Sequence, residues 1–424
     1  TLWFSEAMRN NVAFFLLGLL NNLPGVINNA GASNILPGAI AVVYIINTSP
    51  QLLLKLTAPF WWERLSYRTK ITIAGLCFAA NLVLVSGGLH LPLGVTLLGV
   101  ALSDIGSGLG ECSVLALSQF YDNPKNKLNA WSSGTGAAGV VGYLLSMFVL
   151  PNIPTWGKLV LGAVFVLSYW AAFFILLEAP WVDALRGSSI AGSVLNSVVD
   201  SHANIVDHNG SRNNQLESNF LSDAAPELDG AAHPPQRVVV DIASTFTMRD
   251  RLLLQARLMK YVVPLVVVYW AEYAIQSGAW TAFALPGNEV LVKDSRAKAY
   301  HFFNLFYQIG VLVSRSCGNM CAMSLRLVWA LAWLQVAFLI FFVFDGAFQF
   351  WAGYTLLVPS FAVGLLGGTN YVQTCLSINR CLPPHERELA LSTVSVGGPV
   401  GVFLADVSGL FIQWCLNKAL GIDV

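Results

Sequence analysis

The sequence is constrained above all by eleven apolar segments, each long enough to cross a lipid bilayer. A membrane-spanning helix needs about 20 predominantly apolar residues, and each of these segments has about 18 or more. They run over Val12–Ala30, Leu36–Phe60, Ile71–Leu89, Leu91–Phe120, Trp131–Leu150, Leu159–Leu177, Tyr261–Leu285, Ala299–Cys317, Leu325–Phe344, Phe348–Ile378 and Leu389–Leu416. Charged residues make up only 11% of the chain, whereas soluble domains carry about 25%. The sequence therefore predicts an all-α polytopic membrane protein.

A polar segment divides these spans into two groups. Residues 178–260 hold ten acidic and seven basic residues and are rich in Ser, Asn, Pro and Gly. Such a composition cannot bury a core, so we expect a disordered linker. Its last part, around Phe246–Tyr261, combines basic residues with helical spacing and predicts an interfacial helix. The expected organisation is a six-helix bundle at 1–177, a cytosolic linker at 178–260 and a bundle of about five spans at 261–424.

A weak internal repeat relates the two groups. In each, a glycine-rich segment is followed by a charged turn and a second segment rich in Ser, Thr and Gly. The first copy is GLGECSVLAL with SSGTGAAGVVG, and the second is GLLGGTNYVQT with STVSVGGPVGVF. Two parallel repeats separated by a linker are typical of the major-facilitator architecture. We therefore expect a major-facilitator-like bundle of about 11 transmembrane helices in two pseudo-symmetric halves.

Lysine and arginine residues are distributed unevenly between the two sides that these spans imply. With a cytosolic N-terminus, 17 of the 23 lie in cytosolic segments. Five lie on the far side: Lys158, Lys293, Arg296, Lys298 and Lys418. Cytosolic loops carry an excess of both residue types, so the sequence predicts a cytosolic N-terminus and linker. Lys55, near the end of the second segment, is expected to extend its stem to the membrane interface.

Two spans contain sequences that disfavour regular helix. Pro24 and Gly25 lie within NNLPGVINN in the first segment, and Asn47 to Pro50 interrupt the second. Irregular backbone is tolerated at membrane depth only where protein or a watery cavity covers it. We therefore expect a break in each of these two helices, near a cavity.

Ionisable residues within the spans mark the candidate transport site. Glu111 follows a glycine pair, and Asp104 lies seven residues before it, so two helical turns place both on one face. Buried charges in spans more often line a polar pathway than face lipid. We predict that helices 1, 4, 7 and 10 converge on a central cavity. The candidate solute-binding residues are Glu111, Glu272, Arg315, Asn21, Asn22, Ser133, Thr135, Tyr273, Tyr307, Gln308 and Asn370.

The charged residues within the spans do not decide which solute binds. Arg315 favours an anionic or phosphate-bearing solute, whereas the two glutamates favour a cationic one. Arg315 could instead pair with an acidic residue and hold helices together.

Gly134 and Gly136, in the glycine-rich fifth segment, are predicted to be close helix contacts, because small residues let backbones approach in a bilayer. Glu111→Gln is expected to fold and to lose transport.

Several classes of function lack a signature. The sequence contains no GxSxG, HExxH or P-loop motif, and its six histidines are dispersed. We therefore expect no enzyme activity, no cofactor and no metal site. The net charge of zero gives no reason to expect a nucleic-acid partner.

Seven stretches resemble the battenin (Batten disease protein) family, in particular its fungal vacuolar members. They are FLLGLLNN, SGLGE, WSSGTG, VPLVVVYWAEY, YQIGVLVSRS, GLLGGTNYV and HERELA, in this order over both halves. This chain departs from the animal members at Gly397–Pro399, where they carry an aspartate.

The resemblance implies a major-facilitator-like protein of the lysosomal or vacuolar membrane that exports glycerophosphodiesters from phospholipid breakdown. It also leaves open a vacuolar transporter of basic amino acids that contributes to pH homeostasis. A third alternative, from a different class, is a scaffold that does not transport and whose cytosolic linker recruits trafficking partners.

Overall fold

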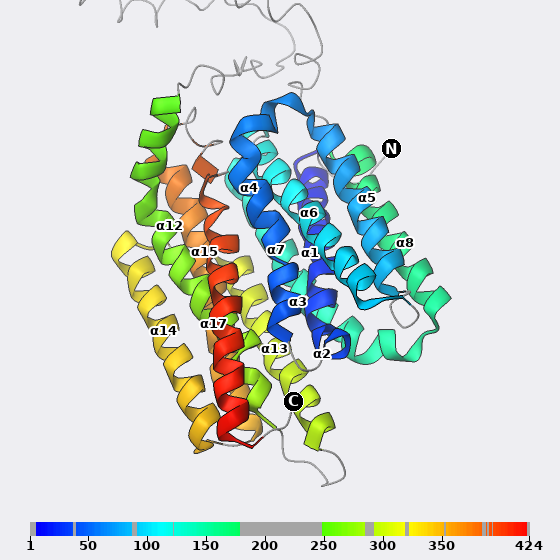
Figure 1. Ribbon diagram of the computed structural model, residues 1–424. Coiled ribbons are helices and arrows are strands. Elements are labelled where there is room, and N and C mark those ends of the chain that lie inside the picture. The colour runs from blue at the N-terminus through cyan, green and yellow to red at the C-terminus, as the bar shows by residue number, and fades with distance from the viewer. Residues whose placement is uncertain are drawn as a thin grey trace, which may run out of the picture. The chain divides into compact units, whose positions relative to one another are not determined.

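The computed structural model describes residues 6–36, 40–86, 91–121, 123–178, 248–284, 292–318, 322–351, 353–383, 387, 390–391 and 393–421. Within these ranges the chain is almost entirely helical and contains no strand. The long helices are α1 (Glu6–Ala30), α3 (Ile40–Ile46) with α4 (Ser49–Trp61), α5 (Tyr67–Ser86), α6 (Leu93–Leu117), α7 (Pro124–Leu144), α8 (Thr155–Ala171), α12 (Met248–Ser277), α13 (Val292–Cys317), α14 (Leu325–Phe348), α15 (Leu357–Cys381) and α17 (Gly397–Ala419). Figure 1 shows them side by side as one bundle. The predicted all-α fold is confirmed.

The predicted spans coincide with these helices. Among the described residues, ten helical stretches are long and apolar enough to cross a membrane. The remaining predicted span, Ala299–Cys317, lies in α13, which is long enough but more polar than the others. Packing explains the difference, because α13 lies between α7 and α15 and is shielded from lipid on both sides. The basic stretch that precedes the seventh span belongs to the same continuous helix, α12.

The two expected helix breaks have different outcomes. The second span is broken as predicted, because α3 ends at Ile46 and α4 begins at Ser49. The prediction for the first span is wrong, since α1 continues through Pro24 to Ala30. Pro24 has no N–H, so the carbonyl oxygen of Leu20, four residues earlier, lacks its helical donor, and α1 nevertheless continues. Directly after the proline, Asn47 at the α3–α4 break donates to the carbonyl oxygen of Gly25 over 3.3 Å and to Asn29 Oδ1 over 2.9 Å.

Within each half, the helices meet at glycines. A Cβ atom on Gly134 of α7 would overlap the carbonyl oxygen of Phe15 in α1, and one on Gly18 would overlap that of Trp131. In the second half, Gly364 of α15 lies equally close to the Tyr307 carbonyl of α13. Backbones this close leave no room for a side chain, so these pairs fix each half as a unit.

Two sets of contacts join the halves. α7 packs against α13, and the α3–α4 pair packs against α17. In the predicted repeat, the α3–α4 pair corresponds to α13, and α7 corresponds to α17. The repeat therefore relates the α7–α13 interface to the interface between α17 and the α3–α4 pair. Gly136 lies in the first interface, where a Cβ atom would come within 2.9 Å of Leu312 Cα. The predicted helix contacts at Gly134 and Gly136 are therefore confirmed, the first within a half and the second between halves.

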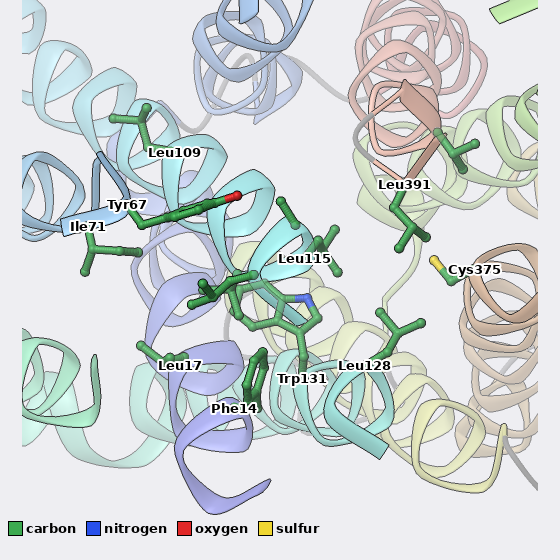
Figure 2. Packing of buried hydrophobic residues seen from close by; sticks show 14 of the residues in the cluster. Phe14, Leu17, Tyr67, Ile71, Leu109, Leu115, Leu128, Trp131, Cys375 and Leu391 are labelled. Atoms are coloured by element: carbon green, nitrogen blue, oxygen red, sulfur yellow. The ribbon is translucent and has the colours of Figure 1, made fainter. Parts of the chain in front are cut away.

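Two apolar clusters contain buried residues from both halves. Figure 2 shows the cluster near the end of the bundle where α8 finishes and α12 begins, which we call the linker end. There Phe14 and Leu17 of α1 pack beside Trp131 of α7, and Cys375 of α15 belongs to the same cluster. The second cluster surrounds Trp280 and lies toward the opposite end of the bundle. Both clusters therefore join the two halves.

Candidate functional site

A cavity of about 160 Å³ lies between the two halves. Helices 1, 4, 7 and 10 of the prediction, which are α1, α6, α12 and α15, all contribute to its wall, as expected. The α3–α4 break, α7, α13 and the start of α17 complete it. Its polar lining residues are Asn22, Asn29, Asn47, Thr48, Gln51, Asp104, Ser107, Glu111, Thr135, Tyr269, Tyr273, Tyr307, Gln308, Arg315, Tyr371 and Ser395.

The structure brings many of the predicted site residues together in this cavity. Asp104 and Glu111 both line it, so the prediction that they share one helix face is confirmed. The predicted residues that line the cavity are Glu111, Asn22, Thr135, Tyr273, Tyr307, Gln308 and Arg315.

Four predicted residues lie outside the lining. Asn21 is fully buried and donates to the carbonyl oxygen of Ser107 over 3.0 Å, and Asn370 donates to the Val328 carbonyl over the same distance. Ser133 is half-buried on α7. Glu272 is buried beside α15, where its carboxylate occupies the space that a side chain on Gly367 would need. Asn21 and Asn370 thus connect helices around the cavity, and Glu272 fills the space between α12 and α15.

Glu111 does not stand alone in the cavity wall. The Lys55 ammonium lies 2.6 Å from Glu111 Oε2, and Gln51 Nε2 donates to the same oxygen over 2.9 Å. The expectation that Lys55 reaches the membrane interface is therefore wrong, since its side chain is only 1% exposed. A lysine near the end of a span usually extends its aliphatic chain so that the ammonium group reaches water. Here the Glu111 carboxylate, on the neighbouring helix α6, provides a buried partner instead.

Asp104 receives a second contact from the same helix. The backbone N–H of Gln51 donates to Asp104 Oδ2 over 2.6 Å. This N–H lies in the first turn of α4, where backbone donors lack an intrahelical partner, and an acidic side chain there is favourable. The break in the second span thus creates the donor that holds Asp104.

Arg315 carries the positive charge on the opposite wall. Its guanidinium donates to Thr135 Oγ1 and to the Tyr269 hydroxyl, and lies 4.6 Å from the ring centroid of Tyr371. Among the described residues, no carboxylate oxygen lies within 4.0 Å of it, and the ion pairs found are Lys55–Glu111 and Arg9–Glu178. Glu272 interacts with it only at longer range. Within the part of the chain that the structure describes, Arg315 thus has no carboxylate as a direct partner.

Sequence reasoning missed the contribution of α4 to the site. Gln51 and Lys55 are four residues apart, so they lie one turn apart on the same helix face. That spacing, directly after a helix break, was a signal for a polar face directed at the cavity. The partner, Glu111, is 56 residues away from Lys55, and no local pattern joins the two.

Comparison with known proteins places this geometry in context. The family model described as CLN3 protein matches residues 12–419. Protein btn-1 of Neurospora crassa is 30% identical over 96% of this chain and 88% of its own length. Battenin of Canis lupus familiaris is 28% identical over 95% and 90%, and Protein BTN1 of Saccharomyces cerevisiae is 29% identical over 94% and 93%.

Solved structures with the same fold are transporters of the major-facilitator type. A POT family transporter in complex with 5-aminolevulinic acid superposes with a TM-score of 0.58 at 11% identity, covering 98% of this chain and 94% of its own. A D-xylose–proton symporter gives a TM-score of 0.55 at 10% identity, covering 99% and 97%. At this identity the likeness shows the fold alone, and it confirms the predicted major-facilitator-like bundle.

Proposed function

Because this chain belongs to the CLN3 (battenin) family, we propose that it is a transporter of lysosomal or vacuolar membranes that exports glycerophosphodiesters by alternating access. A central cavity between two helical halves, lined by residues of both, supports such a mechanism, since rocking of one half against the other exposes the cavity to each side in turn. A cavity of about 160 Å³ with many polar lining residues supports a small, polar solute.

One observation carries the choice of solute. The Arg315 guanidinium faces the cavity and donates to the hydroxyl groups of Thr135 and Tyr269, with no direct carboxylate partner among the described residues. A guanidinium is a planar fork of donors that matches two phosphate oxygens, and tyrosine hydroxyls add further donors. A phosphodiester carries one negative charge, so this single cation is an adequate counter-charge.

The opposite wall suits the rest of such a molecule. Lys55 already compensates the charge of Glu111, which leaves Asp104 as the carboxylate with the weaker partner, a backbone N–H. Carboxylate and amide groups of this wall can accept hydrogen bonds from a glycerol moiety or attract a cationic head group. The two walls together favour a solute with an anionic centre and polar ends.

Transport into liposomes tests the proposal. The purified protein is reconstituted, and uptake of isotope-labelled glycerophosphocholine is compared with uptake of labelled arginine, with empty liposomes as the blank. We expect saturable uptake of the phosphodiester, reduced by unlabelled glycerophosphoethanolamine and unaffected by lysine. Absence of phosphodiester uptake, at a driving gradient of either direction, would contradict the proposal.

The same assay separates the two alternatives. Asp104 and Glu111 line the cavity, and these carboxylates are what a transporter of basic amino acids would need. Arginine uptake in the absence of phosphodiester uptake would favour that function. Uptake of neither solute, together with binding partners captured by the segment 178–260, would favour a scaffold.

A further inference from the structure

A second and larger cavity, of about 360 Å³, lies in the first half of the protein. α1, α5 and α8 form its apolar walls, with side chains such as Leu23, Phe78 and Phe165. The helical turns that follow α7, at Leu145–Val149 and Leu150–Asn152, and one residue of α13, His301, close it on the remaining side.

This cavity is distinct from the central one. Ile27 and Asn28 of α1 line the second cavity, whereas Val26 and Asn29 line the central cavity. One helix, α1, therefore separates the two. No residue is shared between their linings, so a ligand of the second cavity does not occupy the proposed transport site.

The polar groups of the second cavity include a lysine, Lys158. Lys158 lies in the first turn of α8, and among the lining residues there is no carboxylate. Among the described residues, no hydrogen-bond partner is present for Ser146 Oγ or His301 Nδ1, both buried atoms of the lining. Phe165 follows Lys158 by seven residues, which is about 10 Å of helix. The cavity thus extends from a cationic rim into an apolar interior.

We propose that this cavity binds a lysophospholipid with an anionic head group. Its single acyl chain fills the apolar interior, and its phosphate contacts Lys158. A cation near the end of a span lies at the depth of lipid head groups, where it can pair with a lipid phosphate. The volume is near the lower end of the range for ligand pockets, about 300–1,000 Å³, which favours one chain over two.

Binding is measured by native mass spectrometry of the detergent-purified protein. The probes are 1-oleoyl-lysophosphatidylglycerol, which is anionic, 1-oleoyl-lysophosphatidylcholine, which is zwitterionic, and dioleoyl-phosphatidylglycerol, which has two chains. We expect the anionic single-chain lipid to bind at least fivefold more tightly than either of the others. Equal binding of all three, or preference for the two-chain lipid, would overturn the proposal.

Two pairs of variants locate the binding. Leu161→Trp fills the cavity and is expected to abolish binding, whereas Val160→Trp, at an outward-facing position that is 57% exposed, should leave it unchanged. Lys158→Gln should weaken binding of the anionic probe about fivefold and leave the zwitterionic probe unaffected, with Lys298→Gln as its control. If Leu161→Trp fails to fold, the Lys158 pair decides, and equal affinity of Lys158→Gln and the parent rejects the proposal. These measurements report lipid binding and not transport, so their outcome does not depend on whether the proposed function is correct.

Discussion

At the residue scale, the guanidinium of Arg315 combines three contacts that lysine cannot reproduce together. It donates to Thr135 and Tyr269 and lies over the ring of Tyr371. We expect Arg315→Lys to lower glycerophosphodiester transport about tenfold or more while the amount of folded protein stays near that of the parent. Uptake into vesicles, normalised to folded protein, measures this, with the exposed Arg326→Lys as control. Full transport by Arg315→Lys, combined with poor folding of Arg315→Ala, would assign Arg315 a structural role.

The ion pair of Lys55 changes what is expected of Glu111→Gln. From the sequence, this variant should fold; in the structure it leaves a buried ammonium without its anion. Removing one partner of a buried pair costs roughly 3 kcal/mol. We therefore expect Glu111→Gln and Lys55→Met to lower the melting temperature in detergent. The double variant Lys55→Met/Glu111→Gln should recover most of the loss while remaining inactive in transport. Additive losses in the double variant would show that the two side chains do not interact.

Glu111 and Lys55 also show which parts of the site the local sequence can predict. Glu111 was found because a carboxylate in an apolar, glycine-rich run is costly unless it faces a polar region. Lys55 was misplaced because a lysine near the end of a span usually reaches water. Only the tertiary packing of α4 against α6 brings its carboxylate partner within 2.6 Å.

At the element scale, the contact between α1 and α7 depends on the absence of side chains. A Cβ atom on Gly134 would overlap the Phe15 carbonyl, whereas one on the exposed Gly94 of α6 would meet nothing within 4 Å. Overpacking of this kind costs about 1–3 kcal/mol, so Gly134→Ala should lower the melting temperature and the folded yield. Gly94→Ala is the matched control, with an expected change within about 0.5 kcal/mol. Equal melting temperatures for the two variants would mean that α1 and α7 are farther apart than the structure has them.

The helix breaks show which part of an element its own sequence determines. Asn47–Thr48 separates α3 from α4, as the proline three residues after Asn47 predicts. Pro24 does not break α1, although it lies in a similar polar run. Directly after Pro24, Asn47 donates to Gly25 O, a contact between α1 and the α3–α4 break that no local pattern shows. A sequence pattern indicates a weakness in a helix, whereas the surrounding helices decide whether it becomes a break.

At the scale of the whole molecule, the predicted orientation is open to a direct test. Asn209-Gly210-Ser211 is a glycosylation acceptor sequence in the linker, outside the described residues. If the linker is cytosolic, this site stays unmodified. Val290→Ser completes an acceptor sequence at Asn288, between α12 and α13 on the expected lumenal side, and should gain a glycan. A glycosidase-sensitive mass shift that disappears in Asn209→Gln would reverse the orientation.

The architecture followed from the sequence more completely than the site did. Long apolar spans can only be helices in a bilayer, and the linker and repeat predicted two groups of them. The glycines of the repeat recur in the structure as contacts, at Gly134 and Gly364. The four predicted residues outside the cavity lining show the limit, because a span has several faces and the sequence does not say which one each partner helix covers.

Two further contacts between the halves have a consequence for the proposed alternating access. Toward the linker end, the Lys55 ammonium also donates to the carbonyl oxygen of Ser395 over 3.1 Å, and away from it the hydroxyls of Tyr44 and Tyr300 are hydrogen-bonded. In the proposed alternating access, rocking toward either side would break one of these contacts and keep the other, so the cavity would open to one side at a time. The membrane would then stay closed to solutes that the cavity does not bind.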